Sequence, residues 1–155
     1  MEVKLRRATA GDLPRVKDLL ILRSLPLEGV TENFERFWVA EGERELVGAA
    51  GLEVHGRYGL LRSLAVLPTA ANVGIGSRLT WQLLEEAVGQ GLREVYLLTT
   101  TASEFFPRFG FVRVRRREVP SDVLESREFE ACPSTAVVMR WSPTASGIAE
   151  PPTVI

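Results

Sequence analysis

The pattern of apolar and polar positions divides the chain into helix-like and strand-like segments. Two amphipathic helices are predicted: one begins after a capping-box-like start at residues 9–12 and ends before residue 24, and the other runs from residue 75 to a glycine stop at residues 89–91. Short helices are expected at residues 31–34 and 102–109. Strands are predicted at residues 3–7, 37–41, 45–54, 60–66, 95–98, 111–117 and 136–141. Residues 119–133 are expected to form a polar connection.

This order of elements predicts an α/β (α+β) fold. Helices that stand between groups of strands favour a mixed central sheet, and we expect six to seven strands flanked by about four helices. The length of 155 residues suits one domain. We place that domain at residues 1–141. Residues 142–155, rich in Pro, Ser, Thr and Ala, are expected to be a flexible tail.

Composition narrows the class of partner. The chain has 19 basic and 20 acidic residues, and this balance gives no electrostatic reason to bind nucleic acid or an anionic membrane. A small, roughly neutral partner fits better. The start of the chain lacks the apolar core of a signal peptide, and no apolar run approaches the ~20 residues that span a bilayer, so we expect a cytoplasmic protein. The single Cys132 is interpreted as a structural thiol rather than a nucleophile.

The segment with the most chemical content is the predicted strand that ends at Leu64–Pro68, followed by Gly74-Ile75-Gly76 at the opening of the long helix. Unpaired amides at a helix N-terminus favour anions, and glycines let phosphates approach the backbone, so this turn predicts a pyrophosphate site. The alternative is an ordinary glycine-rich helix start. The sequence contains no P-loop motif, and no Gly-x-Gly-x-x-Gly follows the first strand, which disfavours a Rossmann site.

The stretch from Leu64 to Leu79, together with the stretch from Ala102 to Phe111, resembles the acetyl-CoA-binding motifs of the GNAT acetyltransferases. The resemblance extends from about Val3 to Trp141. Within the family the chain is similar to the arsenic-resistance-associated N-acetyltransferases and to amino-acid (glutamate) N-acetyltransferases. The resemblance implies acetyl-CoA as co-substrate, no metal, a small amino-acid-like amine as acceptor, and a homodimer.

The resemblance also assigns the cofactor contacts. The backbone of Leu64 and Val66 would pair with the pantetheine arm, and an N–H near Ala65 or Val66 would meet the thioester oxygen. Thr99 takes the place where the family often has an Asn that contacts pantetheine. The pyrophosphate would be cradled by Val73, Gly74, Ile75, Gly76 and Ser77.

Two positions depart from the family pattern. Ala71 stands where the family usually has an Arg or Gln for the phosphates, and Phe106 stands where it usually has a Tyr that protonates the departing thiolate. A thiolate can leave without help because the pKa of a thiol is only about 8.5.

Acetyl transfer needs a neutral amine, so something must accept a proton. Glu53 and His55, near the end of the third strand, are the candidate bases; the alternative is that both face solvent. Arg62, next to Ser63, is the candidate cation for the acceptor's carboxylate, with a surface ion pair as the alternative. Further substrate-binding candidates are Thr100 and Glu28, which could bind the ammonium group or be a solvated loop carboxylate.

The sequence therefore predicts an N-acetyltransferase for a glutamate-like amino acid or for an analogue of the arsinothricin or phosphinothricin type. One alternative is an acyl-CoA-binding module with little catalysis, which the departures at Ala71 and Phe106 suggest. Another is a protein or peptide N-acetyltransferase, against which the compact loop at residues 25–30 argues.

Overall fold

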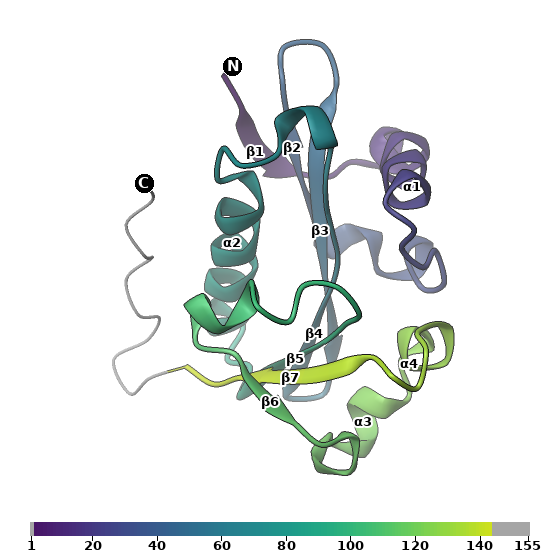
Figure 1. Ribbon diagram of the computed structural model, residues 1–155, viewed down its shortest axis with the longest axis vertical. Helices are drawn as coiled ribbons and strands as arrows, with labels where there is room; N and C mark the ends of the chain where they lie inside the picture. The colour runs from purple at the N-terminus through teal and green to yellow at the C-terminus, as the bar shows by residue number, and fades with distance from the viewer. Residues whose placement is uncertain (1, 144–155) are drawn as a thin grey trace.

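The computed structural model describes residues 2–143 and arranges them on one seven-stranded sheet (Figure 1). The strands are β1 (Lys4–Arg7), β2 (Phe37–Glu41), β3 (Leu46–His55), β4 (Tyr58–Val66), β5 (Glu94–Thr99), β6 (Val112–Val114) and β7 (Val137–Trp141). The α-helices are α1 (Leu13–Leu22), α2 (Ile75–Gly89), α3 (Ser121–Leu124) and α4 (Arg127–Ala131). The prediction of a mixed sheet of six to seven strands with about four helices is confirmed. The expected tail falls largely on residues 144–155, which lie outside the described residues.

The sheet opens between strands β4 and β5. Its order is β1-β2-β3-β4-β5-β7-β6, and all neighbours are antiparallel except β4 and β5. That parallel pair is short, because its register joins only Tyr58 to Glu94, Gly59 to Val95 and Leu60 to Tyr96. Beyond Leu60 the two strands are no longer paired, and both carry backbone groups that are free to bind a ligand as an added strand.

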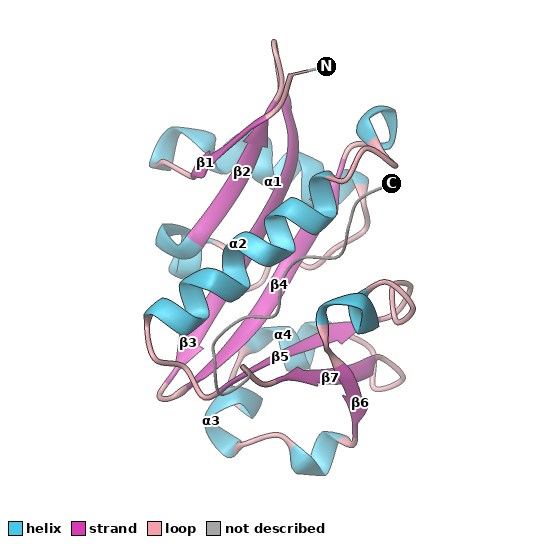
Figure 2. Ribbon diagram, turned by 90° about the vertical axis from the view of Figure 1, so that its left-hand side faces the viewer, coloured by secondary structure: helices cyan, strands magenta, loops and turns pink. Residues whose placement is uncertain are grey.

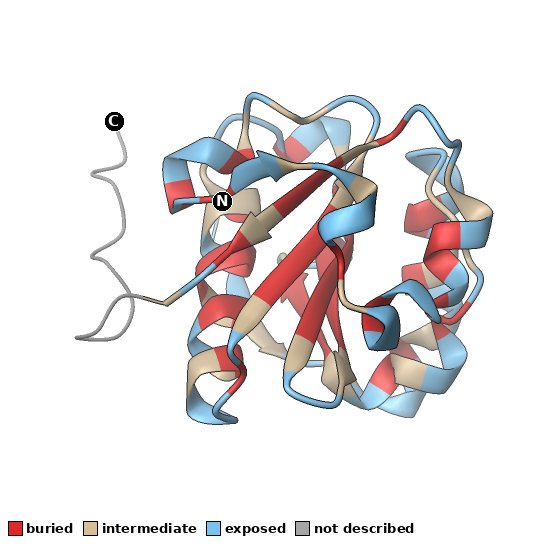
Figure 3. Ribbon diagram, turned by 90° about the horizontal axis from the view of Figure 1, so that it is seen from below, coloured by how far each residue is buried: buried red, intermediate tan, exposed pale blue. Residues whose placement is uncertain are grey.

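Helices cover both faces of the sheet. Helix α2 lies along one face, and α1, α3 and α4 lie on the other (Figures 1 and 2). Successive side chains of a strand point to opposite faces. Accordingly, Leu61 joins the core cluster beneath α2, whereas Leu60 joins the cluster that contains Val123 and Phe129 from α3 and α4. Buried positions therefore follow the strands and the inner sides of the helices (Figure 3).

The prediction that residues 119–133 form a polar connection is wrong. This segment contains α3 and α4, and it packs Val123 and Phe129 against β4, β5 and β7. Ser126 caps α4 by accepting a hydrogen bond from the Glu128 amide. Helices of four and five residues are too short to show an amphipathic period, which explains why the pattern gave no helix here.

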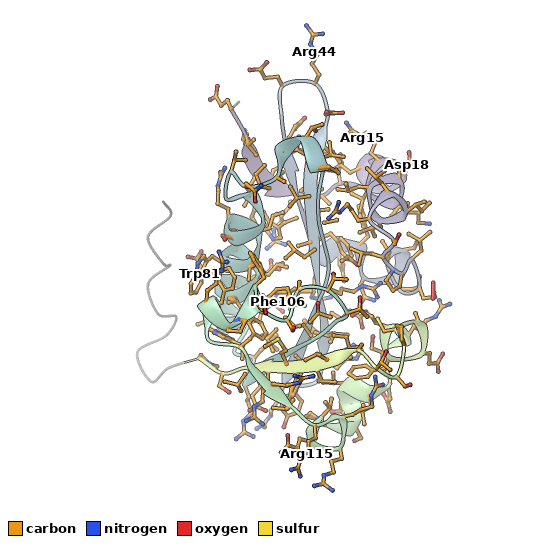
Figure 4. All side chains as sticks on the ribbon, in the orientation of Figure 1. Arg15, Asp18, Arg44, Trp81, Phe106 and Arg115 are labelled. Atoms are coloured by element: carbon orange, nitrogen blue, oxygen red, sulfur yellow. The ribbon has the colours of Figure 1, made fainter. Side chains whose placement is uncertain are left out.

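Two further predictions need correction near the end of the sheet. The helix expected at residues 102–109 is only a short 3-10 helix at Phe106–Phe109. The strand expected at residues 111–117 ends at Val114, because Arg116–Glu118 form another 3-10 turn. Strand β6 is an edge strand, so Val112 is 53% exposed instead of buried. Arg115 projects away from the sheet (Figure 4), as expected for a solvated arginine.

Candidate active site

Two cavities lie at the opening between β4 and β5. The larger has a volume of about 1040 Å³ and the smaller about 430 Å³. Leu64 from β4 and Ala102 from the segment after β5 line both of them. The cavities therefore adjoin where the parallel strands have separated.

The larger cavity is built on the N-terminus of α2. Asn72 and Gly74 have positive φ angles of 65° and 83°, and together they curl the backbone ahead of the helix. The amides of the first helical turn have no acceptor within the helix. A Cβ atom at position 76 would meet only ordinary contacts, with Phe105 at 3.6 Å and Val66 at 3.8 Å. Packing within the protein therefore does not require glycine at position 76, whereas close approach of a ligand to this backbone does.

Two cations border this larger cavity. Arg23, after α1, and Arg108, in the 3-10 helix, both line it, and the Arg108 guanidinium lies over the Phe105 ring at 4.8 Å from the ring centre. Anionic ligands gain from guanidinium groups as well as from helix N-termini. The amides, glycines and arginines thus fit a pyrophosphate, although neither arginine stood out in the sequence.

The smaller cavity is shaped by a bulge in β4. Gly51 pairs with Arg62 and Ala49 pairs with Ala65, so Ser63 and Leu64 together face Ala50 alone. Ser63 has a φ of 59°, which is uncommon for a residue other than glycine. A bulge bends its strand and redirects side chains. Arg62, Ser63 and Leu64 consequently all line the smaller cavity.

Arg62 is held in a buried ionic cluster. Its guanidinium Nη1 donates to Glu53 Oε2 at 2.6 Å and its Nε donates to Ser63 Oγ at 3.0 Å. The other oxygen of Glu53 lies 2.6 Å from His55 Nε2. Burial raises the pKa of Glu53, but the hydrogen bonds from His55 and Arg62 outweigh it and hold that pKa below its ordinary value. Glu53 is therefore a weak base that fixes the position of Arg62.

A second buried carboxyl, Glu128 of α4, faces the same arginine. Its Oε1 lies 4.0 Å from Arg62 Nε, and the side chain lines the smaller cavity. Burial raises the pKa of Glu128 to about 7; the positive charge of Arg62 opposes this rise, and the negative charge of Glu53 adds to it. The smaller cavity thus holds one cation and one carboxyl that can change its charge near neutral pH.

Comparison with known proteins agrees with this architecture. A family model described as the acetyltransferase (GNAT) domain matches residues 33–113. The amino-acid acetyltransferase of Mycobacterium tuberculosis is 33% identical over 130 residues, which cover 77% of this chain and 74% of that protein. The chain belongs to the GNAT acetyltransferase family.

Solved GNAT structures show the same fold. Rv2747 from M. tuberculosis, solved in complex with CoA and NLQ, is 27% identical with a TM-score of 0.78, and the match covers 91% of this chain and 99% of that one. N-acetylglutamate synthase from Neisseria gonorrhoeae, complexed with coenzyme A and N-acetyl-glutamate, has a TM-score of 0.79 at 24% identity over 92% of this chain. The chain spans only 35% of that structure, and 29% of the amino-acid acetyltransferase of Neisseria meningitidis, to which it is 29% identical over 76% of its own length.

The cofactor residues predicted from the GNAT resemblance gather at the two cavities. Thr99 and Phe106 line the smaller one, with Phe106 buried in the interior (Figure 4). Val73 departs from the set, because its side chain is 61% exposed and does not line either cavity. The larger cavity is lined by Leu64, Ala65, Val66, Gly74, Ile75, Gly76 and Ser77.

The residues predicted to bind the acceptor of this GNAT protein also come together. Glu28, Arg62, Ser63 and Thr100 all line the smaller cavity, although they come from a loop, a strand and a second loop. The candidate bases do not join them: Glu53 and His55 line neither cavity and reach the site only through Arg62.

Sequence reasoning missed the contribution of α4, which brings Glu128 and Cys132 to the smaller cavity. Burial raises the pKa of the Cys132 thiol to about 11, so this cysteine is a poor nucleophile at neutral pH. The available sequence signal was the capping Ser126 ahead of two glutamates.

Among residues 2–143, no helix is both long and apolar enough to cross a membrane. The same residues contain no group of three or more His, Cys, Asp or Glu side chains that could hold a metal ion.

Proposed function

We propose that this chain transfers the acetyl group of acetyl-CoA to the amine of a small amino acid or amino-acid analogue. The observation that carries the proposal is Arg62, a buried guanidinium that lines the smaller cavity beside the separated strands. A guanidinium binds a carboxylate with a planar fork of two hydrogen bonds. The likeness to the M. tuberculosis amino-acid acetyltransferase supports an acceptor of this class.

Acetyl-CoA would supply the activated acetyl carbonyl as a thioester. The first turn of α2, with Gly74 and Gly76, would hold its pyrophosphate, and the free edge of β4 at Leu64 and Val66 would hold its pantetheine arm. Because the two cavities adjoin at Leu64, this arm would lead toward the smaller cavity. Phe106 offers no proton there, so the thiolate would depart unaided.

The acceptor would lie in the smaller cavity. Arg62 would bind its carboxylate, and Glu28, exposed at the mouth, would attract its ammonium group. A glutamate-like amino acid meets these requirements, and so does an arsinothricin- or phosphinothricin-type analogue, because each carries a carboxylate beside an amine. We further expect a cytoplasmic homodimer, which sedimentation and fractionation would test.

The first experiment measures CoA release from acetyl-CoA with a panel of amines: glutamate, glutamine, aspartate, arsinothricin, phosphinothricin, amino-acid methyl esters and a short peptide. We expect turnover with one or more free amino acids and little with their methyl esters. Turnover of the peptide alone would favour a protein N-acetyltransferase. CoA binding without turnover of any amine would favour an acyl-CoA-binding module.

The second experiment tests Arg62 without leaving a charge buried and unpaired. Removing Arg62 alone would strand Glu53, so the variants are Arg62→Lys and the double variant Arg62→Met/Glu53→Gln. We expect both to raise the KM for the acceptor at least tenfold while the Kd for CoA stays the same. Arg113→Lys, on the exposed edge strand, is the matched control. An unchanged acceptor KM in the double variant would show that Arg62 does not bind the acceptor.

A further inference from the structure

Glu128 has the features of a group that awaits a ligand. Its side chain is only 4% exposed and lines the smaller cavity. Within residues 2–143 its Oε2 atom is buried and has no hydrogen-bond partner, and its Oε1 atom stands 4.0 Å from Arg62. Buried polar atoms in native proteins are nearly always hydrogen-bonded, so an orphaned carboxyl oxygen beside a cavity marks the place of a missing donor.

We propose that Glu128 is a catalytic residue that accepts a proton from the acceptor's ammonium group. The inference rests on the proposed function, and it adds the general base that the function leaves unassigned. Arg62 and Glu128 place opposite charges in one cavity, with Arg62 Nε 4.0 Å from Glu128 Oε1. An α-amino acid carries its carboxylate and ammonium groups on the same carbon. The pair therefore matches both charged groups of a zwitterion at once: Arg62 takes the carboxylate and Glu128 takes the ammonium.

The other charged groups around Glu128 are less suited to this task. Glu53 is hydrogen-bonded at both oxygens and is a weak base. The Cys132 thiol stays protonated at neutral pH because burial raises its pKa to about 11.

The remaining neighbours are hydrogen-bond donors, lie outside the cavity or are exposed at its mouth. Arg116, whose guanidinium lies over the Phe129 ring at 5.3 Å, offers only hydrogen-bond donors, as does Arg62. His55 lies behind Glu53 and lines neither cavity, and Glu28 is exposed at the mouth. Glu128 is thus the buried carboxyl of the cavity that is free to gain and lose a proton. Its pKa of about 7 suits a base at neutral pH.

The acceptor arrives with a protonated amine, and one proton passes from its nitrogen to the Glu128 carboxylate, which frees the nitrogen lone pair. The nitrogen forms a bond to the acetyl carbon while the carbon–sulfur bond breaks and sulfur leaves as a thiolate. The second proton lost from nitrogen neutralises that thiolate. Glu128 then releases its proton to solvent, so each transfer yields the amide, CoA and one proton.

The test compares Glu128→Gln with Glu130→Gln, an exposed neighbour on the same helix. For wild type and for Glu130→Gln we expect kcat/KM, measured with the amino acid that is turned over best, to rise with pH through an ionisation near 7. For Glu128→Gln we expect a loss of about 100-fold or more, disappearance of that ionisation and an unchanged Kd for CoA. A second readout without ligands is carbon-13 NMR of protein labelled at the glutamate carboxyls, where one signal should titrate near pH 7 and be absent from Glu128→Gln.

Each outcome separates the assignment from the proposed function. If Glu128→Gln keeps the wild-type rate and pH profile, the assignment is overturned while the acetyltransferase function stands. A lower rate with the same ionisation near 7 would also overturn it, because Glu128 would then only position Arg62. If wild type acetylates no amine, the proposed function fails first, and the assignment fails with it.

Discussion

Gly29 lies so close to Arg62 that a Cβ atom at position 29 would stand 2.7 Å from the guanidinium Nη1 atom. The same Cβ would lie 3.5 Å from Glu53 Oε2. The loop after α1 therefore packs directly on the buried ion pair, and only glycine permits that contact. Gly29 also has a φ of 82°, which glycine adopts at no steric cost. Arg62 and the neighbouring loop residues Pro26 and Glu28 line the smaller cavity.

Gly29→Ala is expected to displace Arg62 and so to weaken acceptor binding. We predict at least a tenfold rise in the KM for the acceptor, an unchanged Kd for CoA and a loss of about 1–3 kcal/mol in the free energy of unfolding, because alanine is strained at positive φ. Gly89→Ala in α2 is the control, since a Cβ there meets nothing within 4 Å. Equal acceptor KM values for the two variants would show that the contact of Gly29 with Arg62 does not shape the site.

Gly76→Ala should separate CoA binding from folding. The added methyl group makes only ordinary contacts with Phe105 and Val66, and alanine favours helix over glycine by about 1 kcal/mol, so the stability of the free protein should stay the same or rise. The methyl group would nevertheless stand where the pyrophosphate approaches the helix. We predict at least a tenfold higher Kd for CoA, about 1.4 kcal/mol, by titration calorimetry. Tight CoA binding by this variant would place the pyrophosphate elsewhere.

The parts of the fold that the sequence predicted are those with long periodic patterns. Helix α2 and the strands around it follow directly from regular apolar spacing. The glycine turn at Gly74 and Gly76 left two interpretations open, a pyrophosphate site and an ordinary glycine-rich helix start, and the resemblance to the GNAT motifs favoured the first. The short helices α3 and α4 carry no measurable period, and for that reason Glu128 escaped notice.

The ion pair of Arg62 with Glu53 could not be predicted from the sequence for a different reason. The two residues are nine positions apart on neighbouring antiparallel strands, and they meet diagonally because Arg62 is registered with Gly51. The bulge at Ser63 shifts the register on the other side of Arg62. Sequence alone gives strand identity but not register, so it could list both residues without joining them.

Asp12→Asn is expected to destabilise the N-terminal part of the fold. Arg6 donates to both oxygens of this buried carboxylate, at 2.8 Å and 3.0 Å, and these hydrogen bonds hold the pKa of Asp12 well below its usual range. A lowered pKa in the folded state means that the stabilisation is present above about pH 4 and is lost as the pH falls further.

We therefore predict that Asp12→Asn loses about 1–3 kcal/mol at pH 7 in urea unfolding, and that its stability depends less on pH below 4 than that of wild type. Asp18→Asn is the control, because Asp18 is exposed on the outer side of α1 (Figure 4). Equal losses for the two variants would show that the Arg6 hydrogen bonds contribute nothing specific.

Glu128→Gln is expected to stabilise the protein at alkaline pH. The pKa of Glu128 is raised from 4.5 to about 7 by burial, so between these values the folded protein binds a proton that the unfolded chain has lost. Wild-type stability attributable to this group is then fully present below about pH 4.5 and declines as the pH rises through 7. At pH 8 the cost is on the order of 3 kcal/mol, and glutamine avoids it.

Urea unfolding at pH 4.5 and pH 8 would measure this difference: Glu128→Gln should match wild type at the lower pH and exceed it at the higher, while Glu130→Gln should match wild type at both. A variant less stable than wild type at pH 8 would mean that the attraction of Glu128 to Arg62 outweighs the burial of its charge. If the gain is found, this protein keeps a buried carboxyl that weakens its own fold at neutral pH. Such a cost is expected of a residue retained for its part in the reaction.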